Sequence, residues 1–287
     1  MKIKANRIII IAVVIITTAI ISVTSCFERA FVLFGLNRLP DSSDAVRFVD
    51  VGQGDCTLVQ SDGKLMLIDT GDAKHAISLC EYILSLGFDE IERIIVTHPH
   101  SDHIGGLKTI CKRFRVKSVY ITDVPPNDLK DRNGFYGFKE SYTGTGEIVS
   151  IAKMTPFKLG AFDVWMSFFD EMAADENDRS AVIMLRYDEY DFLITGDLSA
   201  NDALVDFSAD VLKVSHHGSN TGSSMGFLSA VSPEYAVISV GADNSYGHPT
   251  SEVLARLKGV GATVYRTDCN GTVSFLLGDG MKIDTEY

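Results

Sequence analysis

Three histidines and one aspartate lie within residues 98–103, which read His-Pro-His-Ser-Asp-His. Core packing does not require such a density of ionisable groups, because these side chains are seldom buried without a partner. Helical zinc motifs place two histidines four residues apart so that both rings share one face. The alternating His98 and His100, followed by the adjacent Asp102 and His103, suit a loop whose ligand pairs point at two metal ions. Two divalent ions about 3.5–4 Å apart can activate water and hold a phosphate group for in-line displacement.

The sequence around this loop favours a functional site over a solvated polar loop. Residues 91–96 form a short apolar run rich in β-branched side chains, which is typical of a buried strand. Residues 104–110 then read as a tight turn that enters a helix. The candidate ligands therefore follow the carboxyl end of a strand, where α/β sheets place their sites.

Two aspartates also follow strand-like runs directly. Asp69 ends the run from Leu65, and Asp197 follows Ile194 after a Thr-Gly pair. A carboxylate at a strand tip can bridge two cations and offset their repulsion, which makes Asp197 a candidate bridging ligand. The alternative is a carboxylate that caps a turn, an equally common use of aspartate after glycine.

The remaining histidines gather at predicted strand ends in the same way. His216 and His217 follow the run over 210–214, His248 lies in a Tyr-Gly-His-Pro loop, and only His75 of the seven histidines stands apart. Neighbouring side chains on extended backbone point in opposite directions. We therefore expect one of His216 and His217 to bind metal and the other to face the substrate. By itself, a loop histidine such as His248 is more often structural or solvated.

The order of the predicted elements indicates how these residues are positioned. Apolar runs and turn signals predict strands over 45–51, 56–60, 64–69, 91–96, 116–121, 163–169, 181–187, 190–194, 210–214, 235–240, 263–265 and 272–276. Helices are expected over 76–86, 201–207, 226–230 and 251–258, and a long loop near the active site over 124–145. Strands, a helix, more strands and another helix occur twice, which predicts a sandwich of two sheets flanked by helices.

Composition and charge restrict the possible partners. The 287 residues are 46% hydrophobic, enough for a substantial core, and layered α/β enzymes of this length often form one domain. The formal net charge of −12 disfavours broad electrostatic attraction to nucleic acid or to anionic lipid. A polyanionic substrate would have to be drawn locally by metal ions.

The N-terminal 40 residues differ in composition from residues 41–287, which we assign to the catalytic domain. Three basic residues precede 8–27, which carry no charged side chain and match the roughly 20 residues needed to cross a bilayer. The basic flank would remain cytoplasmic, leaving the catalytic domain outside. Small residues before Cys26 also resemble a lipoprotein signal, but apolar residues continue after it, which favours an uncleaved anchor. Both alternatives predict an extracytoplasmic protein tethered to a bacterial membrane.

Several motifs together resemble a known superfamily. The histidine loop over 98–103, with Asp69 before it and Asp197 and His216 after it, is similar to the metallo-β-lactamase superfamily. Within that superfamily the chain resembles the extracellular hydrolase domain of ComEC-type competence proteins, through residues 48–55, 177–180, 195–197, 215–219 and 247–249. The resemblance extends from about residue 46 to residue 275. It implies an α/β fold, an αββα sandwich, with a dinuclear metal site at the edges of the two sheets.

The resemblance also implies a role for each site residue. One ion would be held by His98, His100 and Asp197, and the other by Asp102, His103, Asp197 and His216. Asp69 would orient the histidine loop through hydrogen bonds. Asp102 or the bridging position would hold the attacking hydroxide, and His217 and His248 would contact the phosphate or protonate the leaving oxygen. Residues that would support the ligands or contact substrate are Asp55, Asn177, Ser180 and Ser219.

One departure from the superfamily pattern concerns the first ion. Many superfamily hydrolases have a further histidine between the histidine loop and the bridging aspartate, whereas residues 104–196 contain none. Asn177 and Ser180 occupy the neighbourhood instead. Fewer nitrogen donors favour harder ions, so Mn²⁺ is expected to be tolerated beside Zn²⁺.

The combined prediction is a dinuclear metal hydrolase that cleaves phosphodiesters, with DNA or an oligonucleotide as the substrate that the resemblance implies. Small nucleotides and phosphorylated wall polymers remain alternatives because of the acidic net charge. Competence proteins also carry a membrane channel of many helices, which a chain with one apolar segment lacks, so a channel would be a separate protein. Hydrolysis of a lactam, lactone or thioester is the second hypothesis. A tethered binding module with a vestigial site is the third.

Overall fold

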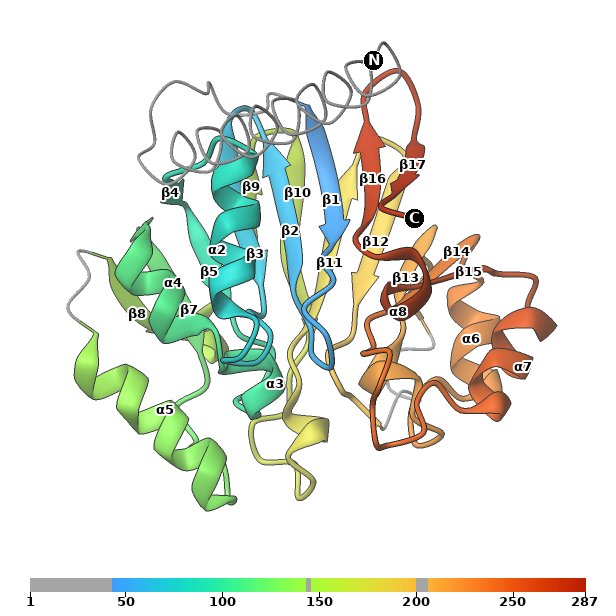
Figure 1. Ribbon diagram of the computed structural model, residues 1–287. Coiled ribbons are helices and arrows are strands. Elements are labelled where there is room, and N and C mark those ends of the chain that lie inside the picture. The colour runs from blue at the N-terminus through green and yellow to red at the C-terminus, as the bar shows by residue number, and fades with distance from the viewer. Residues whose placement is uncertain (1–42, 143–145, 200–205) are drawn as a thin grey trace, which may run out of the picture.

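Two large β-sheets face each other, and helices cover their outer faces (Figure 1). The computed structural model describes residues 43–142, 146–199 and 206–287. Within these ranges the layer order is helices, sheet, sheet, helices, which confirms the predicted αββα sandwich.

The first sheet has eight strands in the order β17-β16-β1-β2-β3-β5-β7-β8. Neighbouring strands from β17 to β3 run antiparallel, and those from β3 to β8 run parallel. The strands are β1 (Asp44–Phe48), β2 (Thr57–Ser61), β3 (Lys64–Ile68), β5 (Arg93–Ile95), β7 (Ser118–Ile121), β8 (Glu147–Ser150), β16 (Val273–Leu277) and β17 (Lys282–Thr285). A separate short parallel pair joins β4 (Glu90–Ile91) to β6 (Arg115–Val116).

The second sheet has seven strands in the order β15-β14-β13-β12-β11-β10-β9. Here β12 to β15 are parallel and β9 to β12 are antiparallel, so each sheet is half parallel. The strands are β9 (Phe157–Leu159), β10 (Phe162–Phe168), β11 (Val182–Tyr187), β12 (Tyr190–Ile194), β13 (Val211–Lys213), β14 (Tyr235–Ile238) and β15 (Thr263–Arg266).

Alternating side chains of the central strands produce the layers. In β3, Leu65 and Leu67 pack against helices, whereas Met66 and Ile68 lie in the core between the sheets. Strand β11 divides its side chains in the same way. The helices over the first sheet are α2 (Ala76–Ser85), α3 (Ser101–Ile104), α4 (Leu107–Arg113) and α5 (Leu129–Ser141). Those beside the second are α6 (Met225–Val231), α7 (Ser251–Gly259) and the short α8 (Thr267–Asn270).

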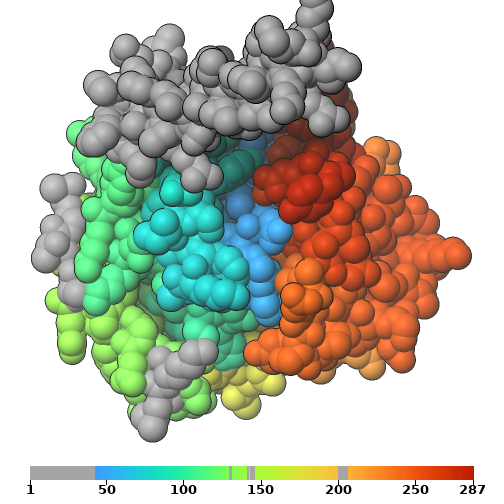
Figure 2. All heavy atoms as spheres, in the orientation of Figure 1, coloured from blue at the N-terminus to red at the C-terminus, as the bar shows by residue number. Residues whose placement is uncertain are grey.

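The candidate ligands all follow the carboxyl ends of parallel strands. β3 and β5 lead into the Asp69 turn and the histidine loop, and β12 and β13 lead into residues 195–197 and 215–218. Figure 1 shows these strand ends at the lower edge of the sandwich. In the space-filling view, residues coloured teal to green lie on one side and orange residues on the other, with blue residues of the first strands between them (Figure 2).

The predicted loop over 124–145 is wrong, because Leu129–Ser141 forms the helix α5. The proline, glycine and asparagine content of the segment obscured a short apolar spacing. Phe135 and Phe138 are three residues apart and are buried among the side chains of the first helical layer. Asp128 precedes the helix, and its carboxylate accepts a hydrogen bond from the Asp131 N–H at 3.4 Å.

Other differences lie at the margins of the sheets. Strands β8, β9 and β17 are edge or near-edge strands that the apolar pattern did not predict. The helix expected over 201–207 falls largely outside the described residues, and so does the proposed anchor over 8–27. Within the part of the chain that the structure describes, no helix has the length and apolar character needed to cross a bilayer.

Candidate metal centre

The carboxylate of Asp69 holds the histidine loop in place. Asp69 leaves β3 with a φ of 60°, and its Oδ1 accepts a hydrogen bond from the Thr97 N–H at 2.8 Å. Its Oδ2 accepts from the Thr97 hydroxyl at 2.7 Å and lies 2.8 Å from Nδ1 of His103. A proton on His103 Nδ1 is therefore bonded, and the lone pair of Nε2 points away from Asp69 toward Asp197. Asp69 thus orients a ligand without reaching the site itself.

His98 and His100 direct one ring nitrogen each at a common point. Their Nε2 and Nδ1 atoms lie 3.0 Å apart. The outer nitrogens have other partners: His98 Nδ1 lies 3.2 Å from the Ser180 hydroxyl, and His100 Nε2 lies 3.0 Å from Glu176 Oε2. When both outer nitrogens keep their protons, the two inner nitrogens carry facing lone pairs. A shared cation relieves that repulsion, so this pair fits a metal ion.

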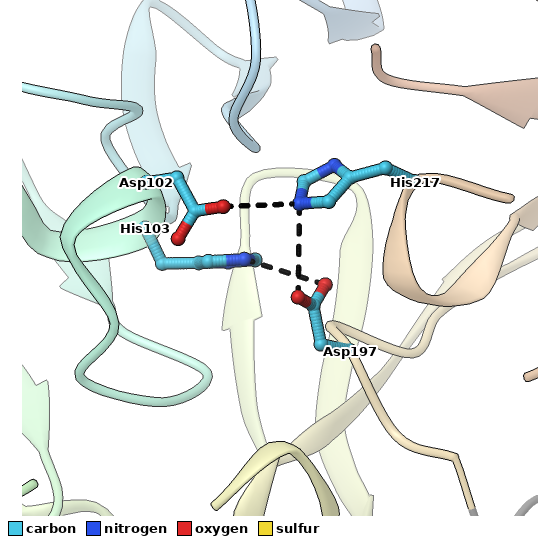
Figure 3. Close-up of side chains that lie close together, drawn as sticks. All are labelled: Asp102, His103, Asp197 and His217. Carbon is cyan, nitrogen blue, oxygen red and sulfur yellow. Dashed lines mark ion pairs between the residues drawn. The ribbon is translucent and has the colours of Figure 1, made fainter. Parts of the chain in front are cut away.

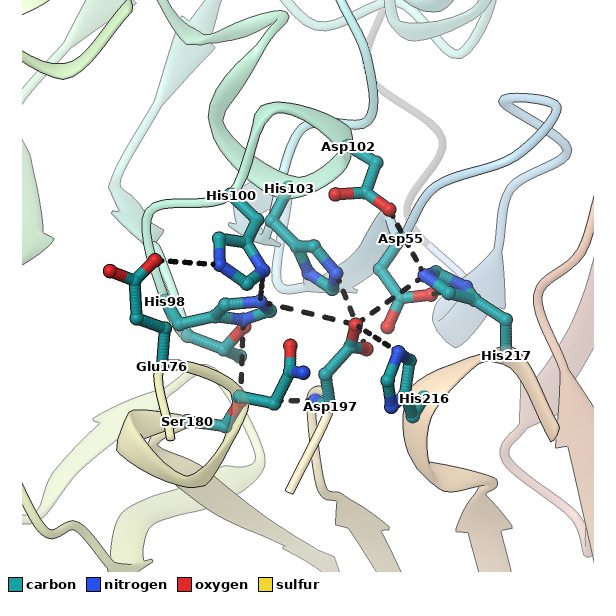
Figure 4. A network of polar contacts seen from close by, with 12 residues as sticks. Asp55, His98, His100, Asp102, His103, Glu176, Ser180, Asp197, His216 and His217 are labelled. Atoms are coloured by element: carbon teal, nitrogen blue, oxygen red, sulfur yellow. Dashed lines mark hydrogen bonds and ion pairs between the residues drawn. The ribbon is translucent and has the colours of Figure 1, made fainter. Parts of the chain in front are cut away.

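Asp197 lies at the centre of the polar network (Figure 4). Its Oδ1 is 3.3 Å from His103 Nε2, and its Oδ2 is 3.9 Å from His98 Nε2. The Asp197 N–H donates to the Ser180 hydroxyl at 3.0 Å. Gly196 before it has a φ of 51°, and a Cβ there would lie 2.9 Å from the Ser180 oxygen. Position 196 therefore requires glycine. The Asp197 carboxylate that follows it lies near both His98 and His103.

Asp102 and His217 complete a second group of ligands on the other side of Asp197 (Figure 3). His217 Nε2 lies 3.3 Å from Asp102 Oδ2 and 3.6 Å from Asp197 Oδ2. Asp102, His103, Asp197 and His217 each offer one ligand atom, and these four atoms all lie within 4.8 Å of one another. Two imidazoles and two carboxylates at such separations form a donor set that a divalent ion such as Zn²⁺ accepts.

His216 lies beside this group rather than in it. Its Nε2 is 3.8 Å from Asp197 Oδ2, its Nδ1 is 3.2 Å from the Thr221 hydroxyl, and 23% of its side chain is exposed. Both histidines of the pair have left-handed backbone, with φ of 51° for His216 and 52° for His217. This turn, rather than strand alternation, separates the two rings. The structure thus brings His217 into the group for which the resemblance had indicated His216.

His248 lies on the open side of the site. Its ring packs edge-on to that of His216, with centroids 5.7 Å apart, and Tyr246 stacks on it at 5.8 Å and 24°. Asn244 fixes the loop, because its side chain bonds both the N–H and the carbonyl oxygen of His248. Within the residues described, Tyr246 is one of the most exposed aromatic side chains, at 69%.

The buried charges of the site call for a positive counter-charge. Burial would raise the pKa of Asp197, but the imidazoles of His103 and His217 hold it well below its usual range. Burial would lower the pKa of His217, but the nearby carboxylates of Asp197, Asp55 and Asp102 raise it to about 10. The carboxylates therefore favour protons on these nitrogens, and a divalent ion supplies the same positive charge in their place.

Unpartnered atoms point to the same position. Among the residues that the structure describes, buried polar atoms without a hydrogen-bond partner include His103 Nε2, Asp197 Oδ1 and His217 Nε2. Such atoms are costly to bury unless something binds them. The residues present therefore fit a bound metal ion.

The other predicted residues surround these ligands. Asn177 begins the 3₁₀ turn η2 (Asn177–Arg179), and its buried Oδ1 has no hydrogen-bond partner among the described residues. Ser180 is fully buried between His98 and Asp197. Ser219 follows the turn η4 (Ser215–Gly218), and its hydroxyl lies 3.0 Å from that of Thr221. Asn177 and Ser180 are thus near the first ligand pair, and Ser219 lies behind His216.

Two contributors to the site carried no signal in the sequence. Glu176 lies on the loop before η2, and its carboxylate bonds His100 and also accepts from the Asn127 N–H. Lys213 ends β13 and forms a buried ion pair with Asp55. Both are single charged residues without a repeating pattern, so only the folded arrangement identifies them.

Comparisons with known proteins agree with this geometry. The profile described as Metallo-beta-lactamase superfamily matches residues 49–242. The chain is 31% identical to the competence protein ComA of Neisseria gonorrhoeae over 262 residues. It is 30% identical to the ComE operon protein 3 of Bacillus subtilis over 274 residues. Each alignment covers 87% of this chain but only 35% of the relative, so the chain spans about a third of those proteins.

Solved structures share the fold at low sequence identity. YhfI of Bacillus subtilis, a metallo-β-lactamase fold protein, aligns with 82% of this chain and 100% of its own, at a TM-score of 0.55 and 13% identity. A diphosphatase of the PhnP family aligns with 84% of this chain and 100% of its own, at a TM-score of 0.53 and 17% identity. With the profile match over more than half of the sequence, the chain belongs to the metallo-β-lactamase superfamily, whose members are generally metal-dependent hydrolases.

Proposed function

We propose that this protein hydrolyses phosphodiesters with two divalent ions, Zn²⁺ or Mn²⁺, held on either side of Asp197. The observation that carries the proposal is the pair of adjacent ligand groups that meet at this carboxylate. One group is His98, His100 and Asp197. The other is Asp102, His103, Asp197 and His217. Bound ions of this kind lower the pKa of water and neutralise charge on a phosphate.

Asp102 is placed to orient the attacking water. Its carboxylate is 30% exposed, whereas Asp197 is 3% exposed, so solvent reaches Asp102 from the open side. Burial would raise the pKa of Asp102, but the nearby imidazoles of His217 and His103 keep it below its usual range. Asp102 therefore remains ionised at neutral pH and accepts hydrogen bonds from water.

We assign His216 and His248 to the phosphate. Burial lowers the pKa of His248, as do the neighbouring imidazoles of His216 and His217. Burial also lowers the pKa of His216. Both rings are therefore neutral at pH 7, and each can donate one N–H to a phosphate oxygen. This leaves His217 with the metal and gives His216 the substrate contact.

The exposed ring of Tyr246 favours a nucleotide substrate. It stacks on His248 and leaves its surface open to solvent beside the proposed phosphate position. Aromatic side chains stack nucleobases with little sequence preference, at about 1–3 kcal/mol per base. The similarity to competence proteins agrees with DNA or an oligonucleotide as the substrate. The net charge of −12 makes recognition local, through metal ions and single rings.

Hydrolysis of bis-p-nitrophenyl phosphate tests the proposal directly. We expect activity that requires added Zn²⁺ or Mn²⁺ and is lost in Asp102→Asn, with an unchanged circular dichroism spectrum. The exposed Asp279→Asn is the matched control and should keep full activity. Turnover by Asp102→Asn at the wild-type rate would contradict the assignment. A lactam or thioester cleaved faster than any phosphodiester would contradict the substrate class.

We further propose that residues 1–40 tether the hydrolase, residues 41–287, to the outer side of a bacterial membrane. The uncharged run over 8–27 behind basic residues supports an anchor. A channel protein is the proposed partner, and the similarity to competence proteins supports this proposal. Labelling with a fatty-acid analogue distinguishes a lipid-modified Cys26 from an uncleaved helix, and protease shaving of intact cells tests the location of the domain.

A further inference from the structure

A fully buried lysine lies directly behind the metal centre. Lys213 is 1% exposed, although its neighbours in β13 are apolar. Alternation along the strand places it on the same face as Val211, which packs in the core between the sheets. Its Nζ lies 2.6 Å from Asp55 Oδ2 and donates to the carbonyl oxygen of Val214 at 3.0 Å. An ammonium group is buried so completely only where a specific partner compensates it.

Asp55, the partner of Lys213, touches three parts of the metal centre. Its Oδ1 lies 3.3 Å from His217 Nδ1 (Figure 4). Its backbone N–H donates to the Asp102 carbonyl oxygen at 3.1 Å, and its own carbonyl oxygen accepts from the Gly71 N–H at 2.8 Å. A Cβ at the preceding Gly54 would lie 2.5 Å from the same Asp102 oxygen. Asp55 therefore sits where the histidine loop, the Asp69 turn and the η4 turn meet.

His217 is oriented by acceptors on its inner side. Nδ1 lies 2.9 Å from the Ser239 carbonyl oxygen and 3.3 Å from Asp55 Oδ1, so its proton is held there. Nε2 then faces Asp102 and Asp197 with its lone pair free. A second consequence concerns Asp55 itself. Asp55, Asp69 and His103 form another group whose ligand atoms lie within 4.8 Å of one another, and the Lys213 ammonium group pairs with the Asp55 carboxylate of this group.

We propose that Lys213 is a positioning residue that acts as a built-in cation. It neutralises Asp55 so that this carboxylate orients His217, and it keeps metal ions out of the group formed by Asp55, Asp69 and His103. The proposal rests on the assignment of His217 to the second metal position. Without Lys213, the buried Asp55 carboxylate lacks its compensating charge, so it no longer holds His217 in the wild-type orientation.

Titration of the metal-free full chain with Co²⁺ tests this role, because Co²⁺ absorption in the visible range reports ligand geometry independently of catalysis. We expect two equivalents to bind the wild type. In Lys213→Met we expect the second equivalent to bind at least about 10-fold more weakly, or with a different spectrum, while the first is unchanged. The exposed pair of Lys158 and Asp163, 2.7 Å apart, provides the control: Lys158→Met should bind both ions as the wild type does.

Two double variants separate charge balance from the contact with His217. Lys213→Met with Asp55→Asn is neutral and keeps an oxygen that can accept from His217, so it should restore the second Co²⁺ site. Lys213→Met with Asp55→Leu is also neutral but has no acceptor at position 55, which leaves His217 Nδ1 only the Ser239 carbonyl oxygen, so it should not restore the site. Because neither double variant leaves an unpaired buried charge, they keep the test valid if Lys213→Met fails to fold.

Several outcomes would overturn the proposal. One such outcome is that Lys213→Met, or the double variant with leucine, binds Co²⁺ with the wild-type affinity and spectrum. That result would show that Lys213 and Asp55 do not position His217. Failure of the double variant with asparagine to restore the site would exclude charge balance as the role of Lys213. Fewer than two equivalents in the wild type would remove the second site altogether. If two Co²⁺ ions bind but no phosphodiester is cleaved, the proposed substrate fails and the role of Lys213 stands.

Discussion

Replacing Asp69 by asparagine isolates the chemistry that orients the histidine loop. Asp69 has a φ of 60°, and asparagine tolerates that conformation, so the backbone is not strained by the change. The substitution converts the Oδ2 acceptor, which bonds the Thr97 hydroxyl and His103 Nδ1, into an N–H donor. The Thr97 hydroxyl can reverse and accept from the amide. His103 Nδ1 can accept only by giving up its proton, which then moves to Nε2.

The expected losses of stability and of metal affinity in Asp69→Asn follow from these contacts. Hydrogen bonds to a charged group contribute about 1.5–3 kcal/mol each. With the Thr97 contact partly recovered, we expect the metal-free Asp69→Asn variant to lose about 3 kcal/mol of unfolding free energy. A proton on His103 Nε2 faces Asp197 and occupies the lone pair that a metal ion needs. Metal affinity should therefore fall about 10–100-fold, as for other outer ligand partners.

Three measurements check this prediction. Denaturant unfolding in chelator gives the stability, competition with a coloured chelator gives metal affinity, and ¹⁵N NMR of the imidazoles reports which nitrogen of His103 carries the proton. Asp62→Asn is the matched control, since Asp62 also has positive φ, at 52°, but lies in the exposed turn between β2 and β3. An Asp69→Asn variant with wild-type metal affinity and an unchanged His103 tautomer would refute the reasoning.

Three further predictions concern the contact between Glu176 and His100, the protonation of His217 and the recognition of the substrate by Tyr246. Glu176→Gln weakens the hydrogen bond that fixes His100, so the first metal equivalent should bind about 10-fold more weakly by chelator competition. In metal-free protein, the pKa of His217 is about 10, above its unfolded value, so its protonation stabilises the fold fully below about pH 6.5. Melting temperatures in chelator should therefore fall between about pH 6.5 and 10, and a flat profile would contradict the buried ion pairs. Tyr246→Ala should raise KM for thymidine 5′-p-nitrophenyl phosphate but not for methyl p-nitrophenyl phosphate, and Tyr246→Phe should match the wild type on both.

The sheets and the strand-end ligands were predictable because local rules govern them. Strand β3 alternates between two apolar layers, and Asp62 with Gly63 supplies the two positive-φ residues that a tight hairpin needs. Carboxyl ends of parallel strands share an edge, which brings Asp69 and the histidine loop together. Asp197 was a candidate ligand for the same reason, because it follows the carboxyl end of the parallel strand β12. Its position between the two groups of candidate ligands depends on the second sheet facing the first.

What could not be predicted depends on tertiary contacts. Two adjacent left-handed residues at His216 and His217 separate the two rings by a turn instead of by strand alternation, and no local pattern besides Gly218 signals that turn. Helix α5 contains Gly134 and Gly137, and its formation depends on burying Phe135 and Phe138 against the first helical layer. Glu176 and Lys213 act across long sequence separations, so their partners appear only in the folded chain.

The pairing of β1 with β16 sets the order in which this protein can mature. Asp44 is in register with Leu277, so the first sheet stays incomplete until the ribosome has made nearly the whole domain. The two ligand groups likewise need residues 98–103 together with residues 197 and 217. Contacts between such distant segments form late and slowly, because the loops between them must close first. A metal ion could therefore be held only after these segments have come together, and a chain interrupted before residue 217 would lack part of the proposed site.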